Sequence, residues 1–299
     1  MKPEPIIVAP RGWRLWWQAA RPRTLTIAAT PVIAGTALAW SQGAHPAWLA
    51  ALAALFAALL IQAGTNLHND AADYERGNDT AARIGPPRVT AAGWATPRAV
   101  KRAAFLAFAG AFASGTYLVA VGGWPILAIG LASLAAAWAY SGGPRPISYT
   151  PLGELFVLVF FGIFAVAGSH YLQSGHLSAT ALLAGLAIGA PAAAVLLVNN
   201  YRDLDGDKAA GRRTLAAVLG RAGAQRLYGF LMLLPFVLTP VIAIARPGAL
   251  LAFVALPGAW GLLRRMPAAS DAASLNRLLA GTAQGQVIFG ILFALGVSV

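Results

Sequence analysis

The sequence predicts an all-α membrane protein built from nine transmembrane helices. Two observations carry this prediction. The first is composition: 58% of the 299 residues are hydrophobic, 11% are charged, and the mean hydropathy is +0.66, whereas a soluble domain has about 25% charged residues. The second is that the hydrophobic residues fall into stretches of about 20, the length that crosses a bilayer.

The expected spans leave two long loops on one side of the membrane and only short ones on the other. They are residues 22–41, 46–66, 99–121, 123–141, 152–172, 178–200, 224–245, 247–263 and 277–298. Several are rich in Ala and Gly, which let helices pack closely in lipid.

Residues 1–21 form a separate N-terminal segment. It is rich in basic and aromatic side chains (Arg11, Trp13, Arg14, Trp16 and Trp17) and leads into the first span with no clear cleavage site. Such a segment predicts a short helix lying on the bilayer surface.

The basic residues predict the orientation. With the N-terminus in the cytoplasm and the spans alternating, all of the 22 Lys and Arg residues except Arg246 fall on the cytoplasmic side, as the positive-inside rule requires. This accounts for the net charge of +12 without nucleic acid. We therefore expect a multi-pass protein of the plasma (inner) membrane, with the long loops near 67–98 and 201–223 and the active site facing the cytoplasm.

A weak internal repeat relates two parts of the chain. The second and the sixth spans each run into an Asn, an Asp four residues later, and another Asp after three or four more. This predicts one polytopic domain, 1–299, with two related halves of about 22–141 and 152–263 and a final helix, 277–298.

Each copy of the repeat forms a polar stripe, because residues three and four apart share a helix face. The first stripe is Asn66, Asn69, Asp70 and Asp73, the second is Asn199, Asp203 and Asp207, and Asp79 could add a further carboxylate. Carboxylates gathered in one pocket repel one another unless cations neutralise them. Oxygen ligands without Cys or His favour Mg²⁺, which commonly bridges carboxylates to phosphate groups.

Basic residues accompany both stripes. Arg83 and Arg88 follow the first, and Arg202, Lys208, Arg212 and Arg213 follow the second. Acids and bases around one cavity predict a metal–diphosphate site, in which the bases neutralise the leaving group.

The alternative is that these charges only pair with one another at helix ends. We prefer that interpretation for Glu75 and Asp205, which point away from the stripes. His68 and His170 are likewise expected to be packed or interfacial rather than metal ligands.

The two motifs resemble those of a known family. Asn69-Asp70-x-x-Asp73 and Asp203-x-x-x-Asp207 are similar to the aspartate-rich motifs of the UbiA superfamily of intramembrane prenyltransferases, as are their places after spans two and six. Other segments resemble the menaquinone branch, the 1,4-dihydroxy-2-naphthoate prenyltransferases; they include 21–25, 85–90, 140–146, 152–154 and 275–276. Glu154 departs from that branch, where Asp is expected.

This resemblance implies roles for the site residues and a UbiA-type bundle for the fold. Mg²⁺ and the diphosphate of a polyprenyl donor would be held by Asn69, Asp70, Asp73, Asp203 and Asp207, the four aspartates being catalytic. The remaining substrate-binding residues would be Asn66, Asp79, Arg88, Tyr140, Arg145, Asn199, Arg202, Lys208 and Arg212, together with Arg21 and Arg23 for the acceptor or phosphate. Arg21 and Arg23 are equally well explained as ordinary positive-inside residues.

The implied reaction is electrophilic. Diphosphate departs, an allylic cation forms in a dry apolar bundle, and an electron-rich ring attacks it. With 1,4-dihydroxy-2-naphthoate the ring carboxylate leaves as CO₂, giving demethylmenaquinone. The alternatives are another acceptor such as 4-hydroxybenzoate, a CDP-alcohol phosphatidyltransferase, whose downstream acidic motif is missing here, and a transporter, whose acids should lie nearer mid-bilayer.

Overall fold

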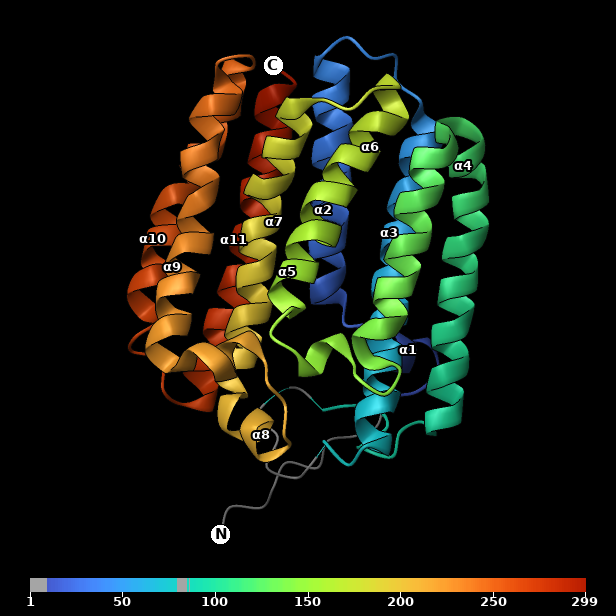
Figure 1. Cartoon of the computed structure of the whole chain (residues 1–299), viewed down its shortest axis with the longest axis vertical. Helices are drawn as coiled ribbons and strands as arrows, with labels where there is room; N and C mark the ends of the chain where they lie inside the picture. Colours follow the sequence, from blue (N-terminus) through green and yellow to red (C-terminus); the bar gives the residue numbers. More distant parts are fainter. Residues whose placement is uncertain (1–9, 80–84, 86) are drawn as a thin grey trace.

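The computed structural model describes residues 10–79, 85 and 87–299, and their regular structure is entirely helical (Figure 1). The longest helices are α2 (Pro22–Ser41), α3 (Trp48–Glu75), α4 (Pro97–Ser141), α7 (Ala179–Arg202), α9 (Leu215–Ala243) and α11 (Ala272–Val297). Two further elements are composite: α5 (Gly153–Val157), the π-helix η2 (Leu158–Phe164) and α6 (Ala165–Ser174) follow one another without a break, as do η3 (Pro247–Ala255) and α10 (Leu256–Arg265). The short elements are α1 (Trp13–Ala19), η1 (Ile147–Tyr149) and α8 (Leu204–Ala209).

Eight of these elements are long and apolar enough to cross a membrane, and one of them, α4, is long enough for two spans. Its 45 residues would extend roughly 70 Å as a straight helix, about twice the thickness of the hydrocarbon core. Gly123, with φ 68° and ψ −156°, interrupts the helix, and Figure 1 shows the chain reversing at the top of α4. The limbs 97–122 and 124–141 match the spans predicted at 99–121 and 123–141, so the eight membrane-length elements of the described residues are compatible with the nine predicted spans.

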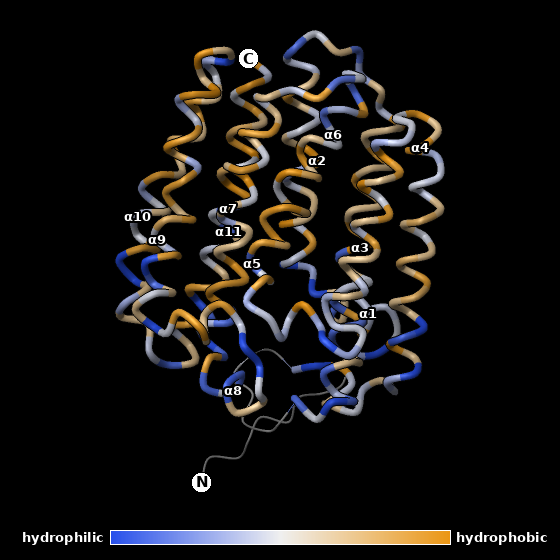
Figure 2. Tube along the Cα trace, viewed as in Figure 1, coloured by the Kyte–Doolittle hydropathy of each residue, from blue (hydrophilic) through white to orange (hydrophobic). Residues whose placement is uncertain are grey.

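The two ends of the bundle differ in polarity. Figure 2 shows hydrophilic residues concentrated at the lower end, around α8 and the ends of α3 and α7. We call this the polar end; the opposite end carries the reversal of α4 and the C-terminus (Figure 1). The exposed α1, with Trp13 and Trp17 at its surface, confirms a short helix before the first span, while its place on a bilayer stays a prediction.

The most deeply buried of the membrane-length helices is α7, which is apolar from Ala181 to Val198. Ala187, Ile188 and Leu197 are fully buried, as expected for a helix surrounded by others. Because most of α7 is buried against neighbouring helices, its end at the polar end is a fixed platform for the second motif.

The π-helix η2 lies unusually close to α7. A Cβ added to Gly189 would lie 2.7 Å from the Cα of Gly162 and 2.8 Å from the carbonyl oxygen of Leu158, so only glycine allows this approach. Small residues at such crossings are a common means of helix association in lipid. On its other side, this element lines the interior with Phe160 and Phe161.

Candidate active site

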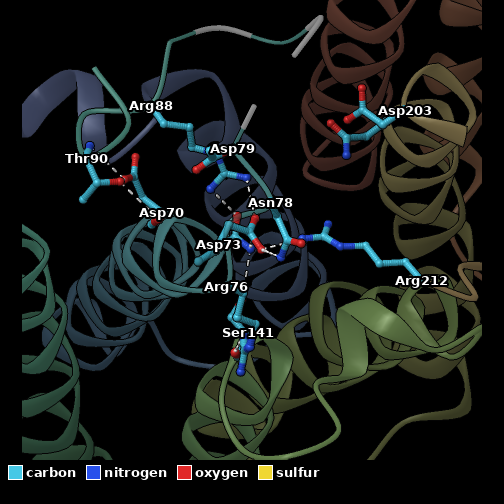
Figure 3. Close-up of polar contacts among 12 residues, drawn as sticks. Asp70, Asp73, Arg76, Asn78, Asp79, Arg88, Thr90, Ser141, Asp203 and Arg212 are labelled. Carbon is cyan, nitrogen blue, oxygen red and sulfur yellow. Dashed lines mark hydrogen bonds and ion pairs between the residues drawn. The ribbon is translucent and has the colours of Figure 1, made fainter. Parts of the chain in front are cut away.

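Asp73 lies in the middle of the polar end, between two arginines (Figure 3). Nη2 of Arg88 donates to Asp73 Oδ2 at 2.8 Å, and Nη2 of Arg212 donates to Oδ1 at 2.5 Å. The Asp73 side chain is only 2% exposed, and a buried carboxylate requires this kind of compensation. Two loops far apart in the sequence therefore meet at one residue of the first motif.

Asn69 extends this cluster along α3. Its Oδ1 accepts from Nη1 of Arg88 at 2.6 Å and from Nη2 of Arg21 at 3.4 Å, and its Nδ2 donates to Oγ of Ser141 at 3.0 Å. Arg21 is the N-cap of α2 and has a left-handed backbone, with φ 55°. Asn69 thus links α3 to the start of α2 and to the end of α4.

Asp70 points away from this cluster, toward the loop that follows α3 (Figure 3). It accepts from the backbone N–H groups of Val89 at 3.0 Å and Thr90 at 3.1 Å, and from the Thr90 hydroxyl. The loop also closes on itself, since the N–H of Ala92 donates to the carbonyl of Arg88 at 2.9 Å. Both Asp70 oxygens therefore hold the loop that carries Arg88.

The second motif does not occupy one helix, and in this respect the predicted stripe is wrong. α7 ends at Arg202, Asp203 takes φ −93° and ψ 7°, and α8 begins at Leu204. The N–H of Asp207 still donates to the carbonyl of Asp203 at 2.8 Å, so the four-residue spacing survives.

Asp203 is neutralised by its own neighbour. Arg202 donates to both Asp203 oxygens, at 2.8 and 2.6 Å, and to Oδ1 of Asn199 and of Asn276, each at 3.0 Å. Asp203 keeps 25% of its side chain exposed and stands apart from Asp73 in Figure 3. Asn276, at the start of α11, ties the last span to the second motif.

Arg212 connects the two motifs, because it contacts Asp73 of the first and Asp207 of the second, the latter at 3.6 Å. The turn at Gly211, with φ 72°, and a bond from the N–H of Arg212 to the carbonyl of Asp207 at 2.8 Å direct the arginine back toward the bundle. Burial raises the pKa of Asp207 to about 6, and Arg212 partly offsets this effect.

Tyr149 on η1 is a site residue that the sequence did not single out. The guanidinium of Arg212 lies 4.7 Å from its ring centre and that of Arg76 lies 5.7 Å away, in the range of cation–π attraction. Its hydroxyl accepts from Nδ2 of Asn78, and its carbonyl accepts from the N–H of Arg213 at 3.0 Å. Arg76 also donates to the carbonyls of Ser141 at 2.6 Å and of Gly143 at 3.1 Å. No motif marks these residues in the sequence.

Other predicted site residues are placed as follows. Asn66 lines the interior and donates to the carbonyl of Ala20 and to the hydroxyl of Thr24, both at 2.8 Å. Asp79 is buried, with Oδ1 3.5 Å from Nε of Arg88. The interior is also lined by Tyr140, Arg23 and Asn199. Arg145 and Lys208 are exposed and do not line it, and Arg83 lies outside the described residues.

The residues expected to be structural have structural contacts. Glu75 pairs with Lys101 at 2.6 Å and Asp205 with Arg221 at 2.9 Å, all exposed. His68 stacks on Trp138. His170 is fully buried, and Nε2 of its ring lies 2.8 Å from Oε1 of Gln42 near the opposite end.

A cavity of about 1740 Å³ connects the acid–base cluster to the interior of the bundle. Its polar part is lined by Asp70, Asp73, Asp203, Asp207, Arg88 and Arg212, and much of the rest by apolar residues of α4, η2 and α11. This volume exceeds the 300–1,000 Å³ usual for small-ligand sites. It suits a ligand with a charged head and a long apolar body.

The oxygen donors of the site are of the type that binds a divalent cation, but in this structure they are not arranged around one. Within the described part of the chain, no group of three or more acidic, His or Cys side chains is arranged to hold a metal ion. Asp73, Asp203, Asp207 and the Oδ1 of Asn69 nevertheless supply hard oxygen donors of the kind that Mg²⁺ prefers. In this structure arginines neutralise these acids instead.

Fold and site together define a polytopic membrane protein in which a buried acid–base cluster opens into a large, mostly apolar cavity. The chain belongs to the UbiA prenyltransferase family, whose model matches residues 28–282. It is therefore a prenyltransferase.

Similar proteins include two curated enzymes. The chain is 40% identical to the 1,4-dihydroxy-2-naphthoate octaprenyltransferase of Mycobacterium tuberculosis, over 81% of this chain and 82% of that protein. It is 36% identical to the enzyme of the same name from Escherichia coli, over 94% of each.

Solved structures share the fold at low sequence identity. The apo structure of a UbiA homolog from Aeropyrum pernix K1 has a TM-score of 0.70 at 16% identity, covering 90% of this chain and 97% of that one. A UbiA homolog from Archaeoglobus fulgidus, bound to DMAPP and Mg²⁺, has a TM-score of 0.55 at 14% identity, covering 93% and 98%.

Proposed function

We propose that this chain transfers a polyprenyl group from its diphosphate to 1,4-dihydroxy-2-naphthoate. The C–O bond of the donor breaks and its electron pair leaves with diphosphate. A new bond forms between the prenyl carbon and the ring, and the ring carboxylate leaves as CO₂, which gives demethylmenaquinone in its reduced form. We infer a prenyl diphosphate donor because a basic cluster lies in the polar part of a large, mostly apolar cavity. The names of the curated relatives support 1,4-dihydroxy-2-naphthoate as the acceptor.

Arg88 and Arg212 are the proposed diphosphate ligands. A guanidinium offers parallel N–H donors that match phosphate oxygens, and both groups line the cavity. The face of the Tyr149 ring supports Arg212 from one side, so this arginine can exchange a carboxylate for a phosphate oxygen without losing its position. Positive charge placed in advance at the leaving group lowers the barrier to C–O cleavage.

Mg²⁺ would be held by Asp73, Asp203 and Asp207 with Asn69. When bound it would supply further positive charge to the departing diphosphate, and the homolog solved with DMAPP and Mg²⁺ supports its use in this fold. The acids proposed to hold it are the same ones that Arg88, Arg202 and Arg212 neutralise in this structure.

The apolar wall protects the cation. Phe156, Phe160 and Phe161 line the cavity, and aromatic ring faces attract a nearby positive charge. A dry wall also excludes the water that would convert the allylic cation to an alcohol. Attack by the aromatic ring is then the available outcome.

The acceptor is tested by competition. Purified protein is supplied with one polyprenyl diphosphate and with either 1,4-dihydroxy-2-naphthoate or 4-hydroxybenzoate, and kcat/KM is measured for each. We expect the naphthoate to be preferred and its product to lack the carboxylate. Trace turnover of the smaller ring decides nothing, because a missing apolar ring is a weak basis for exclusion. Preference for hydroxybenzoate, or a product that keeps its carboxylate, would contradict this acceptor.

A further inference from the structure

Glu154 places a buried carboxyl group behind the wall of the cavity, in the first turn of α5. The residue is 4% exposed and does not itself line the cavity. Its Oε1 accepts from Nδ2 of Asn200 at 2.9 Å, whereas Oε2 is buried and has no hydrogen-bond partner among the described residues. A buried oxygen without a partner costs stability, so the needs of the fold do not explain this acid.

α5 packs against α7 at two successive residues (Figure 1). A Cβ added to Gly153 would lie 3.1 Å from Cδ2 of Leu196, and the next residue, Glu154, bonds to Asn200. Leu196 and Asn200 are four residues apart and therefore share a face of α7, and both line the cavity. The close packing at Gly153 thus fixes Glu154 behind a residue that borders the cavity.

The bond to Glu154 determines how the Asn200 amide is turned. Its Nδ2 donates to the carboxyl oxygen, which leaves the amide oxygen, Oδ1, for another partner. Within the part of the chain that the structure describes, the Asn200 side chain makes no second hydrogen bond. Asn200 is only partly buried and lines the cavity, so a ligand in the cavity can supply that partner.

The wall around Asn200 suits a flat ring. Phe156, two residues after Glu154, and Leu196, one turn before Asn200, both line the cavity. An aromatic ring can lie against these apolar side chains while a group on its edge reaches Oδ1 of Asn200. The wall therefore combines apolar contact with one oriented hydrogen-bond acceptor.

The chemistry of this wall favours a hydroxyl over a phosphate. Oδ1 can only accept a hydrogen bond, and the ionised oxygens of a diphosphate have no hydrogen to give. The carboxyl group of Glu154 behind Asn200 also disfavours a second anion here. Arg88 and Arg212 offer the donors that a diphosphate needs, and they line the polar part of the same cavity.

We propose that Asn200, held in place by Glu154, accepts a hydrogen bond from the ring hydroxyl next to the carbon that attacks the prenyl cation. Asn200 is then a specificity-determining contact for the aromatic acceptor, and Glu154 is a positioning residue. The proposal rests on the proposed transfer to 1,4-dihydroxy-2-naphthoate. There the hydroxyl concerned is the one on C1, beside the carbon that bears the carboxylate.

This contact strengthens as the ring attacks. A pair of ring electrons forms the new C–C bond, and the C1 oxygen shares a lone pair with the ring, so this oxygen becomes a protonated carbonyl with a positive charge. When CO₂ leaves from the attacked carbon, its bonding pair returns to the ring and the hydroxyl keeps its proton. No base is needed, and an acceptor backed by a carboxyl group stabilises the charge that develops.

The first test compares the naphthoate with its two methyl ethers, 1-methoxy-4-hydroxy-2-naphthoate and 4-methoxy-1-hydroxy-2-naphthoate. The 1-methoxy compound cannot donate to Asn200, so with the wild-type protein its kcat/KM should be lower than that of the naphthoate by about ten-fold or more. The 4-methoxy compound keeps the C1 hydroxyl and is the matched control. In Asn200→Ala the naphthoate should fall to the level of the 1-methoxy compound, since the partner of the hydroxyl is gone.

The second test separates positioning from folding. Glu154→Leu replaces a buried, incompletely bonded carboxyl group with an apolar side chain, so the Tm in detergent should be equal to wild type or higher. The kcat/KM for the naphthoate should nevertheless fall about ten-fold or more, with the KM for the prenyl diphosphate unchanged. Glu154→Gln keeps an acceptor oxygen for Asn200 and should retain more activity than Glu154→Leu. Glu75→Gln, in the exposed pair with Lys101, should match wild type.

Several results would overturn the proposal. No loss with the 1-methoxy compound in the wild type does so without any variant, and so does a loss that persists undiminished in Asn200→Ala. A raised KM for the prenyl diphosphate or a raised Mg²⁺ requirement in Asn200→Ala would assign Asn200 to the metal–diphosphate site instead. If the wild type does not prenylate the naphthoate at all, the proposed function is wrong; prenylation without this dependence on the C1 hydroxyl removes only the Asn200 contact.

Discussion

Asp203 and Asp205 are separated by one residue, yet their surroundings differ. Asp203 lines the cavity and is paired with the buried Arg202, whereas Asp205 forms an exposed pair with Arg221. Asp203→Asn removes one negative charge from the proposed metal–diphosphate site. We expect turnover to fall by at least about a hundred-fold, with the folded protein retained in the membrane.

Asp205→Asn is the matched control for this substitution, because exposed ion pairs contribute little to stability and Asp205 does not line the cavity. Turnover of this variant should match wild type. Near-normal turnover of Asp203→Asn, or full activity of the wild type in excess EDTA, would contradict the proposed site.

We predict that Asp70 supports activity indirectly, by holding the loop that carries Arg88. Asp70→Asn replaces one acceptor oxygen with a donor facing the N–H groups of Val89 and Thr90, and a hydrogen bond to a charged group contributes about 1.5–3 kcal/mol. Exchange of these two amide hydrogens should accelerate by about ten-fold or more. Thr90→Val, which removes only the hydroxyl, should have a smaller effect.

The loop hypothesis also predicts how activity changes in Asp70→Asn. The variant should resemble Arg88→Ala, with weakened donor binding and an unchanged Mg²⁺ concentration for half-maximal activity. A large rise in the Mg²⁺ requirement, with no change in amide exchange, would instead favour direct metal ligation by Asp70.

Asp207 is predicted to make two properties depend on pH in opposite directions. Its pKa is raised from 3.8 to about 6 by burial, so the metal-free folded protein binds this proton more tightly than the unfolded chain does. The group's contribution to stability is therefore greatest below pH 4 and is lost as the pH rises through about 6. A metal ligand must be deprotonated, so Mg²⁺ affinity should fall as the pH drops below about 6.

Two titrations check the role of Asp207: Tm in EDTA against pH, and the Mg²⁺ concentration for half-maximal activity against pH. The difference between wild type and Asp207→Asn isolates this carboxyl from other titrating groups. Wild-type and variant curves of the same shape between pH 4 and 7 would show that Asp207 has no such role.

At the scale of elements, the contact between η2 and α7 is expected to be the least tolerant of added volume. Gly189→Ala puts a methyl group 2.7 Å from the Cα of Gly162, which forces the two helices apart and should cost about 1–3 kcal/mol. Thermal unfolding in detergent should show a lower Tm for this variant. Gly261→Ala, where nothing lies within 4 Å, should keep the wild-type Tm or raise it; an equal Tm for both variants would contradict the packing argument.

The spans could be predicted because lipid demands long apolar stretches, and their order agrees with the structure. The apolar span predicted at 46–66 is shorter than α3, which continues to Glu75, as the predicted helical stripe from Asn66 to Asp73 requires. Hydropathy marks Asn69 and Asp73 as polar and ends the span before them. Their hydrogen bonds to Arg88 and Ser141, which hydropathy does not contain, let the helix continue with these residues buried.

The site could be predicted only as far as local spacing reached. Helical spacing and charge mark the motif aspartates, Arg88 and Arg212 in the sequence, so these residues could be predicted. All of them line the cavity. Tyr149 and Arg76 owe their place to packing between elements distant in the chain. The resemblance implies a diphosphate contact for Lys208, but neighbouring residues of a helix point in different directions, and the Lys208 side chain is exposed and does not line the cavity.

On the scale of the whole molecule, the two related halves stay a prediction. What the structure adds is that both motifs lie at the polar end of one bundle and meet through Arg212. The acid–base cluster therefore contains residues from both proposed halves, and α11 is joined to it through Asn276. The side of the membrane on which this cluster lies decides which compartment supplies the diphosphate donor.

We predict that the polar end faces the cytoplasm, because every Lys and Arg of the sequence except Arg246 falls on that side when the spans alternate. The chain has no cysteine, so single cysteines report position without background. Ala210→Cys lies in the exposed turn after α8 and His45→Cys in the exposed connection between α2 and α3, at the opposite end. A membrane-impermeant thiol reagent added to intact cells should label the cysteine at 45 and reach the one at 210 only after permeabilisation. Both sites are exposed in the fold, so protection can come only from the membrane. The reverse pattern would place the active site outside the cell, and labelling of both sites in intact cells would contradict an odd number of crossings between them.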